Sequence, residues 1–224
     1  MSGVLLDELV EFAENPEPRC PVLLLVDTSG SMSGERIRQL NQGISIFKEE
    51  VIKDDVARMR AEIAIVSFGG SVKLRQDFVT VDDFEHVQLI TEGDTPMGQG
   101  IEYALNLVEK RKEIYRSNGI QFYRPWIFLI TDGGPTDEWK SAAQRVRQCE
   151  SSKKITFFAV GVEEADMSIL REISPPERPP VKLQGLSFNS MFMWLSSSMS
   201  RVSSGKVGDM QALEPIRGWG SIES

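Results

Sequence analysis

Four apolar runs of strand length lie along the chain and predict the centre of a β-sheet. They occupy residues 22–26, 126–130 and 155–160, with residues 62–68 as a fourth candidate. A run without polar alternation fits a strand that is buried on both faces, as in a parallel sheet covered by helices. We therefore expect these segments to lie side by side inside the protein.

A fifth segment shows the alternation of a half-exposed strand. Between residues 72 and 78, apolar side chains alternate with charged ones, at Val72, Lys73, Leu74, Arg75, Asp77 and Phe78. Only Gly69-Gly70-Ser71 separates this segment from the run at 62–68, which is the spacing of a β-hairpin. The pattern predicts one antiparallel strand at the edge of the sheet.

Helical periodicity fills the gaps between the predicted strands. Apolar residues recur at intervals of three and four over 37–51, 101–108 and 188–202, and Thr136 has the character of a helix N-cap that is followed by acidic residues. Alternating strands and helices predict an α/β fold of three layers, with a doubly wound, mostly parallel sheet and one antiparallel edge strand.

The ends of the chain differ from this pattern. Residues 1–19 carry a short amphipathic stretch, with Leu5, Leu6, Leu9 and Val10 on one helical face, and then a proline-containing breaker. Residues 203–224 are polar with few apolar anchors, which predicts a flexible C-terminal tail. We therefore expect an N-terminal extension over 1–19 and one domain over 20–202.

Composition and charge narrow the classes of partner and of chemistry. The net charge of −8 repels phosphate backbones and anionic lipids, so we expect neither nucleic acid nor membrane as a partner. His86 is the only histidine and lies in a polar, acidic stretch, which excludes a Ser-His-Asp triad and favours a surface position.

The N-terminal residues and the cysteines bear on localisation. Asp7, Glu8 and Glu11 stand where an export signal would carry basic residues, and no apolar run approaches the roughly 20 residues that cross a bilayer. Cys20 and Cys149 are too few for a disulfide framework and lack metal-ligand spacing, so we expect unpaired thiols. These features predict a cytoplasmic protein.

Three loops at strand ends or at a helix start carry oxygen-bearing side chains. The first strand runs into Asp27-Thr-Ser-Gly-Ser31, the strand at 126–130 ends in Thr131-Asp-Gly133, and residues 93–98 lead into a helix. Sites in doubly wound sheets form at the carboxyl ends of the strands, near the point where strand order reverses. Convergence of these loops would gather Asp27, Ser29, Ser31, Thr95 and Asp132.

These five side chains form a ligand set made of oxygen alone. Magnesium prefers oxygen ligands in octahedral geometry and retains some water. Only Asp27 and Asp132 are charged. If the hydroxyls contact the ion and the carboxylates act through water, the ion stays electrophilic and attracts an acidic group from a partner.

Each loop has an ordinary structural explanation when taken singly. Asp27 and the serines fit helix caps, while Thr95 before Pro96 and Asp132 before Gly133 fit tight turns. The three loops in this order, each at a predicted strand end or helix start, favour a joint site instead.

The three segments resemble the metal-ion-dependent adhesion site of von Willebrand factor type A domains, and the resemblance covers about residues 20–202. Residues 124–139 and 192–198 are similar to the bacterial TerY-like branch, which is associated with tellurium resistance. The resemblance implies Ser29, Ser31 and Thr95 as metal-contacting hydroxyls, with Asp27 and Asp132 acting directly or through water. It implies magnesium, or else manganese or calcium.

The resemblance also implies a binding protein rather than an enzyme. The expected partner is a protein that offers a carboxylate to the metal, and a kinase or phosphatase of the same stress system is one candidate. Asp94 departs from the family pattern, in which a small residue often precedes the site threonine. This carboxylate either strengthens metal binding and makes the ion less attractive to an acidic partner, or points to solvent, which we favour.

A magnesium-dependent phosphohydrolase is the alternative function. Asp27 at the end of a first strand is similar to the nucleophile of aspartyl-phosphate enzymes. Those enzymes need a second acid two residues later, where this chain has Ser29, and the loops near Thr95 and Asp132 hold no lysine for a phosphoryl group. A binding module is therefore the preferred reading.

Overall fold

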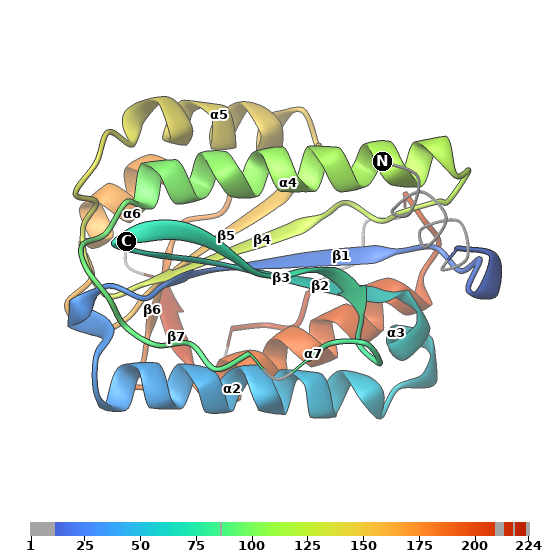
Figure 1. The fold of residues 1–224 in the computed structure, drawn as a ribbon, viewed down its shortest axis with the longest axis horizontal. Coiled ribbons are helices and arrows are strands. Elements are labelled where there is room, and N and C mark those ends of the chain that lie inside the picture. The colour runs from blue at the N-terminus through green and yellow to red at the C-terminus, as the bar shows by residue number, and fades with distance from the viewer. Residues whose placement is uncertain (1–11, 86, 209–212, 217, 223–224) are drawn as a thin grey trace.

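The chain folds around one twisted sheet. The computed structural model describes residues 12–85, 87–208, 213–216 and 218–222. Over that part of the chain, seven strands lie in the order β3-β2-β1-β4-β5-β6-β7, and helices cover both faces (Figure 1). The predicted three-layer α/β fold is confirmed.

The centre of the sheet is parallel and buried. It consists of β1 (Cys20–Asp27), β2 (Ala61–Gly69), β4 (Trp126–Thr131) and β5 (Thr156–Gly161), and every residue of these strands is buried. β1 pairs with β2 on one side and with β4 on the other. The four apolar runs therefore correspond to strands covered on both faces, as predicted.

Both edges of the sheet are antiparallel. β3 (Ser71–Thr80) forms the predicted hairpin with β2. At the other edge, β6 (Val181–Leu183) is parallel to β5, and β7 (Gly220–Ile222) returns antiparallel to β6. The short strands β6 and β7 carry too few residues to show a period in the sequence.

The helices form two layers with separate apolar cores. In Figure 1, α2 (Glu35–Ile52), α3 (Asp55–Arg60) and α7 (Phe188–Ser204) cover one face, and α4 (Met97–Ser117), α5 (Lys140–Ser151) and α6 (Met167–Ile173) cover the other. Alternate residues of β1 serve the two cores: Leu24 faces α2 and α7, whereas Leu23 and Leu25 belong to the opposite cluster.

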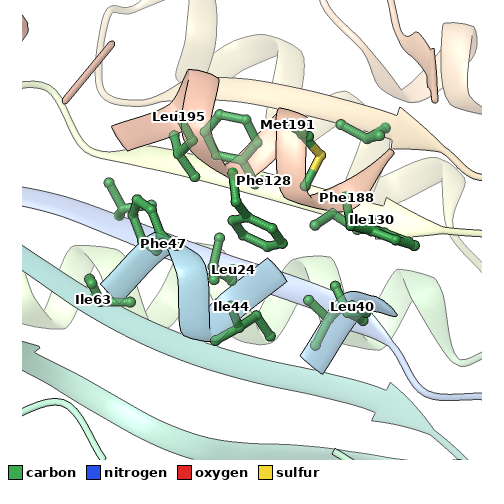
Figure 2. Packing of buried hydrophobic residues seen from close by; sticks show 14 of the residues in the cluster. Leu24, Leu40, Ile44, Phe47, Ile63, Phe128, Ile130, Phe188, Met191 and Leu195 are labelled. Carbon is green, nitrogen blue, oxygen red and sulfur yellow. The ribbon is translucent and has the colours of Figure 1, made fainter. Parts of the chain in front are cut away.

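Figure 2 shows the core between β1, β4, α2 and α7. Leu24 and Phe128 of the strands pack with Ile44 and Phe47 of α2 and with Met191 of α7. The methionine- and phenylalanine-rich face of α7 is thus part of the core.

The start of α5 differs from the sequence prediction. The helix begins at Lys140 rather than after Thr136, and Glu138 accepts a hydrogen bond from the backbone N–H of Lys140 (2.8 Å). Asp137 instead accepts from the backbone N–H groups of Gly98 and Gln99, at 2.9 and 2.8 Å. Because Pro96 at the N-cap of α4 offers no capping side chain, Asp137 supplies that cap from another loop.

Part of the segment expected to be a flexible tail packs on the domain. Trp219 is 2% exposed and lies against Trp194 of α7, with ring centroids 5.2 Å apart. The backbone carbonyl of Glu214 accepts a hydrogen bond from Trp194 Nε1 (2.7 Å). The expectation overlooked that one large aromatic residue can anchor an otherwise polar segment. The amphipathic stretch over 5–10 and His86 lie outside the described residues.

A buried ionic cluster lies at the end of the sheet where β1 begins. Glu62 accepts hydrogen bonds from Arg19 Nε and Arg111 Nε, both at 2.8 Å, and from the hydroxyl of Tyr115. Glu62, Arg19 and Tyr115 are fully buried, and the guanidinium of Arg19 lies 5.2 Å from the ring centroid of Phe12. The cluster joins residues before β1 to β2 and α4.

In the part of the chain that the structure describes, none of the helices is both long and apolar enough to span a membrane.

We expect Glu62→Gln to lower the free energy of unfolding by about 3–5 kcal/mol, because it leaves two buried guanidinium groups without their carboxylate. Urea denaturation measures the change. Glu35→Gln is the matched control, since Glu35 pairs with Arg38 in solvent and its loss should leave stability unchanged. Equal stability of the Glu62 variant and the wild type would contradict a structural role for the cluster.

Candidate functional site

The first loop of the site follows β1 directly. Asp27 ends the strand, and its Oδ1 accepts a hydrogen bond from the backbone N–H of Ser29 (2.8 Å). The hydroxyls of Ser29 and Ser31 lie 3.0 Å apart. Ser29 is the N-cap of a short 3-10 helix (Gly30–Met32) and Gly34 is the N-cap of α2, and neither cap uses a side chain. The serine hydroxyls are therefore not helix caps, and they lie together beside Asp27.

The second loop, at the end of β4, meets the first. Thr131 Oγ1 donates to Asp27 Oδ2 (2.5 Å), and Ser31 Oγ donates to Asp132 Oδ1 (2.7 Å). β1 and β4 are neighbours at the point where the chain changes direction across the sheet, as the strand order requires. Four of the five predicted residues, namely Asp27, Ser29, Ser31 and Asp132, thus form one connected group.

The third loop is held against the first by backbone hydrogen bonds. The N–H of Gly30 donates to Gly93 O (3.0 Å), and the N–H of Glu92 donates to Thr28 O (2.7 Å). Gly93 has a φ of 63°, and a Cβ there would lie 2.4 Å from the Cα of Gly70. Only glycine fits this close approach, which fixes the loop beside Asp27-Thr-Ser-Gly-Ser31.

Thr95, in the third loop, is buried against the loop after β4. Its N–H donates to Thr136 Oγ1 (3.1 Å), and its carbonyl accepts from the N–H of Thr136 (2.9 Å). The side-chain hydroxyl of Thr95 has no hydrogen-bond partner among the described residues, although Thr95 is only 6% exposed. The backbone of Thr95 is thus fixed, and its hydroxyl remains available to a ligand.

Asp94 lies at the surface beside this group. It is exposed, and its Oδ2 is 3.4 Å from Thr136 Oγ1, a long hydrogen bond. Its carbonyl accepts from the N–H of Gly70 (2.9 Å). This exposure agrees with the expectation that the Asp94 side chain points to solvent.

The electrostatics of the site centre on Asp27. Burial raises the pKa of the Asp27 carboxyl, and the nearby charge of Asp132 raises it further, against the opposing effect of hydrogen bonds from Thr131 and Ser29. Among the described residues, no basic side chain forms an ion pair with Asp27, whereas Arg36 lies 3.4 Å from Asp132 Oδ2. A fully buried carboxylate beside a second carboxylate is a location where a cation would be stabilised.

The donor set fits a hard divalent cation that retains water. Throughout the described segments, no group of three or more His, Cys, Asp or Glu side chains is placed to hold a metal. A metal here would therefore rely on the hydroxyls of Ser29, Ser31 and Thr95 as well as on the two carboxylates. Such an all-oxygen set suits magnesium better than zinc or copper.

Two residues of the site were not anticipated from the sequence. Arg36, on the first turn of α2, donates from Nη1 to the carbonyl of Ser31 (2.7 Å) and forms an ion pair with Glu163. Glu163 belongs to the turn after β5. Both look like ordinary surface residues in the sequence, and only the topology places them together.

The fold and the site define an α/β domain with oxygen-bearing loops at the switch point of a parallel sheet. The chain belongs to the von Willebrand factor type A domain family, whose model matches residues 22–190.

Among curated proteins, the chain is similar to the collagen alpha-5(VI) chain of Homo sapiens, at 30% identity over 165 residues, which cover 70% of this chain and 6% of that protein. It is also similar to matrilin-3 of Mus musculus, at 23% identity, covering 67% of this chain and 31% of matrilin-3. The chain therefore spans less than a third of either relative.

Solved structures agree on the fold. A von Willebrand factor type A protein from Catenulispora acidiphila superimposes with a TM-score of 0.63 at 15% identity, covering 82% of this chain and 43% of that one. The pilus adhesin SpaC from Lactobacillus rhamnosus GG, in an open conformation, gives 0.68 at 12% identity, covering 83% and 30%. At these identities the likeness establishes the fold alone.

We expect Asp137→Ala to lower the free energy of unfolding by about 1 kcal/mol, because α4 loses the carboxylate that caps its first N–H groups. Asp166→Ala is the matched control, since Asp166 caps α6 through Ser168 and Ile169 within its own loop. Both variants should lose similar stability in urea. Unchanged stability of the Asp137 variant alone would show that the inter-loop cap contributes nothing.

Proposed function

We propose that this protein is a metal-dependent protein-binding module that captures an acidic group of a partner. The observation that carries the proposal is the buried Asp27 carboxylate, which lies beside Asp132 and two serine hydroxyls and has no cationic partner in the described structure. A divalent cation would compensate this charge and would link the three loops.

Ser29, Ser31 and Thr95 would hold the metal through their hydroxyls, and Asp27 and Asp132 would hold it directly or through water. We propose magnesium, with manganese or calcium as substitutes in the same oxygen set. When bound, the ion would supply a Lewis-acidic position for a carboxylate from outside. Hydroxyl ligands carry no charge, so the ion would keep more attraction for a partner's acid than an ion surrounded by carboxylates.

Binding rather than turnover agrees with the arrangement of Asp27. Both of its oxygens are engaged, one by the N–H of Ser29 and the other by the hydroxyl of Thr131. A carboxylate held in this way is poorly placed to attack a phosphoryl group, and the position two residues later is Ser29 rather than an acid. Membership of the type A domain family, which implies a binding protein rather than an enzyme, agrees with this proposal.

The setting that we propose is a bacterial stress or tellurium-resistance system, on the strength of the TerY-like stretches over 124–139 and 192–198. The partner would be a protein of that system, with a kinase or phosphatase as a candidate. We also propose a cytoplasmic location, which agrees with the two unpaired thiols, Cys20 and Cys149.

Asp27→Asn tests the metal site. A raised pKa means that the Asp27 carboxyl favours folding when protonated, and that this contribution is lost as the pH rises through the pKa of the folded state. In metal-free protein, Asp27→Asn should therefore raise the melting temperature at neutral pH. The variant should also abolish the rise that magnesium or manganese produces in the wild type.

Asp94→Asn is the control for this measurement, because exposed Asp94 lies outside the proposed ligand set and its variant should keep the response to metal. Calorimetric titration with manganese provides a second readout. Undiminished manganese binding by the Asp27 variant would show that Asp27 is not part of a metal site.

Capture of the partner is tested by a pull-down from native cell extract with and without EDTA. We expect a carboxylate-bearing partner to be retained by the wild type in magnesium and released by EDTA. Thr95→Ala should weaken retention at least about tenfold while leaving the circular dichroism spectrum unchanged. Thr91→Ala, four residues earlier and outside the proposed ligand set, should behave as the wild type. Retention that is unaffected by EDTA would refute metal dependence.

A further inference from the structure

Arg36 places a guanidinium group at the rim of the proposed metal site. Its Nη1 donates to Ser31 O (2.7 Å) and lies 3.4 Å from Asp132 Oδ2. Ser31 and Asp132 both belong to the proposed ligand set. A fixed positive charge therefore lies directly beside the position where the partner's acidic group would arrive.

Glu163 holds this guanidinium in place from a third direction. Its carboxylate accepts from Arg36 Nε. Glu163 has a φ of 45°, in the left-handed region that non-glycine residues rarely adopt. The backbone on either side is fixed by hydrogen bonds: the N–H of Val162 donates to Thr131 O (2.8 Å), and the N–H of Ala165 donates to Val162 O (3.0 Å). Such strain persists where surrounding contacts impose it, and it concentrates at functional sites.

The guanidinium retains unused hydrogen-bonding capacity. Arginine carries five N–H donors in a planar fork. Nε and Nη1 of Arg36 are engaged, but Nη2 has no acceptor among the described residues, and the side chain is 28% exposed. A planar fork with free donors, oriented by two carboxylates and one carbonyl, matches the geometry of an incoming carboxylate.

We propose that Arg36 is a second recognition residue for the partner, so that the acidic group is bound by the metal and by the Arg36 guanidinium together. The proposal rests on the metal-dependent function proposed above and specifies its ligand. A side chain that offers a carboxylate would satisfy both contacts, whereas a neutral oxygen ligand such as an amide would gain little from the guanidinium.

The proposal predicts that loss of Arg36 changes the affinity for the metal and the affinity for a carboxylate differently. The positive charge of Arg36 repels a cation, so Arg36→Gln should bind manganese as tightly as the wild type or up to about threefold more tightly. The same variant should lose affinity for a carboxylate by about tenfold, because a charged hydrogen-bonded contact disappears. A residue with a merely structural role would not separate the two affinities in this way.

The probes are manganese alone and then acetate added to the manganese-loaded protein. Manganese affinity is measured by calorimetry, and acetate binding by the relaxation of its methyl protons near the paramagnetic ion. Arg36→Lys, which retains the charge but not the fork, should fall between the wild type and Arg36→Gln in acetate affinity. Arg38→Gln, two residues along the same helix and paired with Glu35 in solvent, should match the wild type in both measurements.

The outcomes separate this proposal from the one on which it rests. If the wild type fails to bind manganese, the metal-dependent function itself is wrong, and the role of Arg36 falls with it. If the wild type binds manganese and acetate but Arg36→Gln retains the full acetate affinity, the metal site stands and Arg36 is not a recognition residue.

Discussion

The burial of one carboxylate is the constraint on which this architecture depends. Asp27 ends the central strand β1 and is fully buried, and its two oxygens are engaged by Ser29 and Thr131. Hydrogen bonds from neutral donors offset only part of the free-energy cost of burying a charge. At neutral pH the Asp27 carboxylate therefore destabilises the folded state, and a bound cation would relieve this cost. These loops suit the cation proposed above, because the hydroxyls of Ser29 and Ser31 lie beside Asp27 and Asp132 and the loop backbones are hydrogen-bonded to one another.

The rest of the domain keeps these loops in register. The strand order places the ends of β1 and β4 side by side, and the Gly93 loop is pinned to the first loop by hydrogen bonds between backbones. Asp137 caps α4 and Thr136 accepts from the N–H of Thr95, so the loop after β4 is fixed to the segment that leads into α4. At the opposite end of the sheet, Glu62 ties β2 to α4 and to the residues before β1. The geometry of the candidate metal site therefore depends on connections between loops rather than on any single loop.

Much of the fold could be predicted, because a strand buried on both faces is apolar at most of its positions and a hairpin must be short. The positions of Asp27-Thr-Ser-Gly-Ser31 and Asp132 at the ends of β1 and β4 likewise predicted that their side chains would lie close together. Contacts between distant loops could not be predicted: Asp137 looks like a first-turn residue of the helix after it, yet it caps α4. Arg36 and Glu163 are 127 residues apart, and nothing local in either segment distinguishes them from surface charges. Trp219 was missed because a single aromatic residue creates no period.

The central position of β1 also has a consequence for how the chain acquires its structure during translation. β1 is synthesised about a hundred residues before its second neighbour, β4, since Asp27 and Thr131 are 104 positions apart. At typical synthesis rates this interval is roughly 5–20 s, during which the largely apolar β1 lacks its partner on one edge. β1 is entirely buried in the finished protein but passes through this interval with one edge unpaired, and early pairing with β2 and packing of α2 are its available protection.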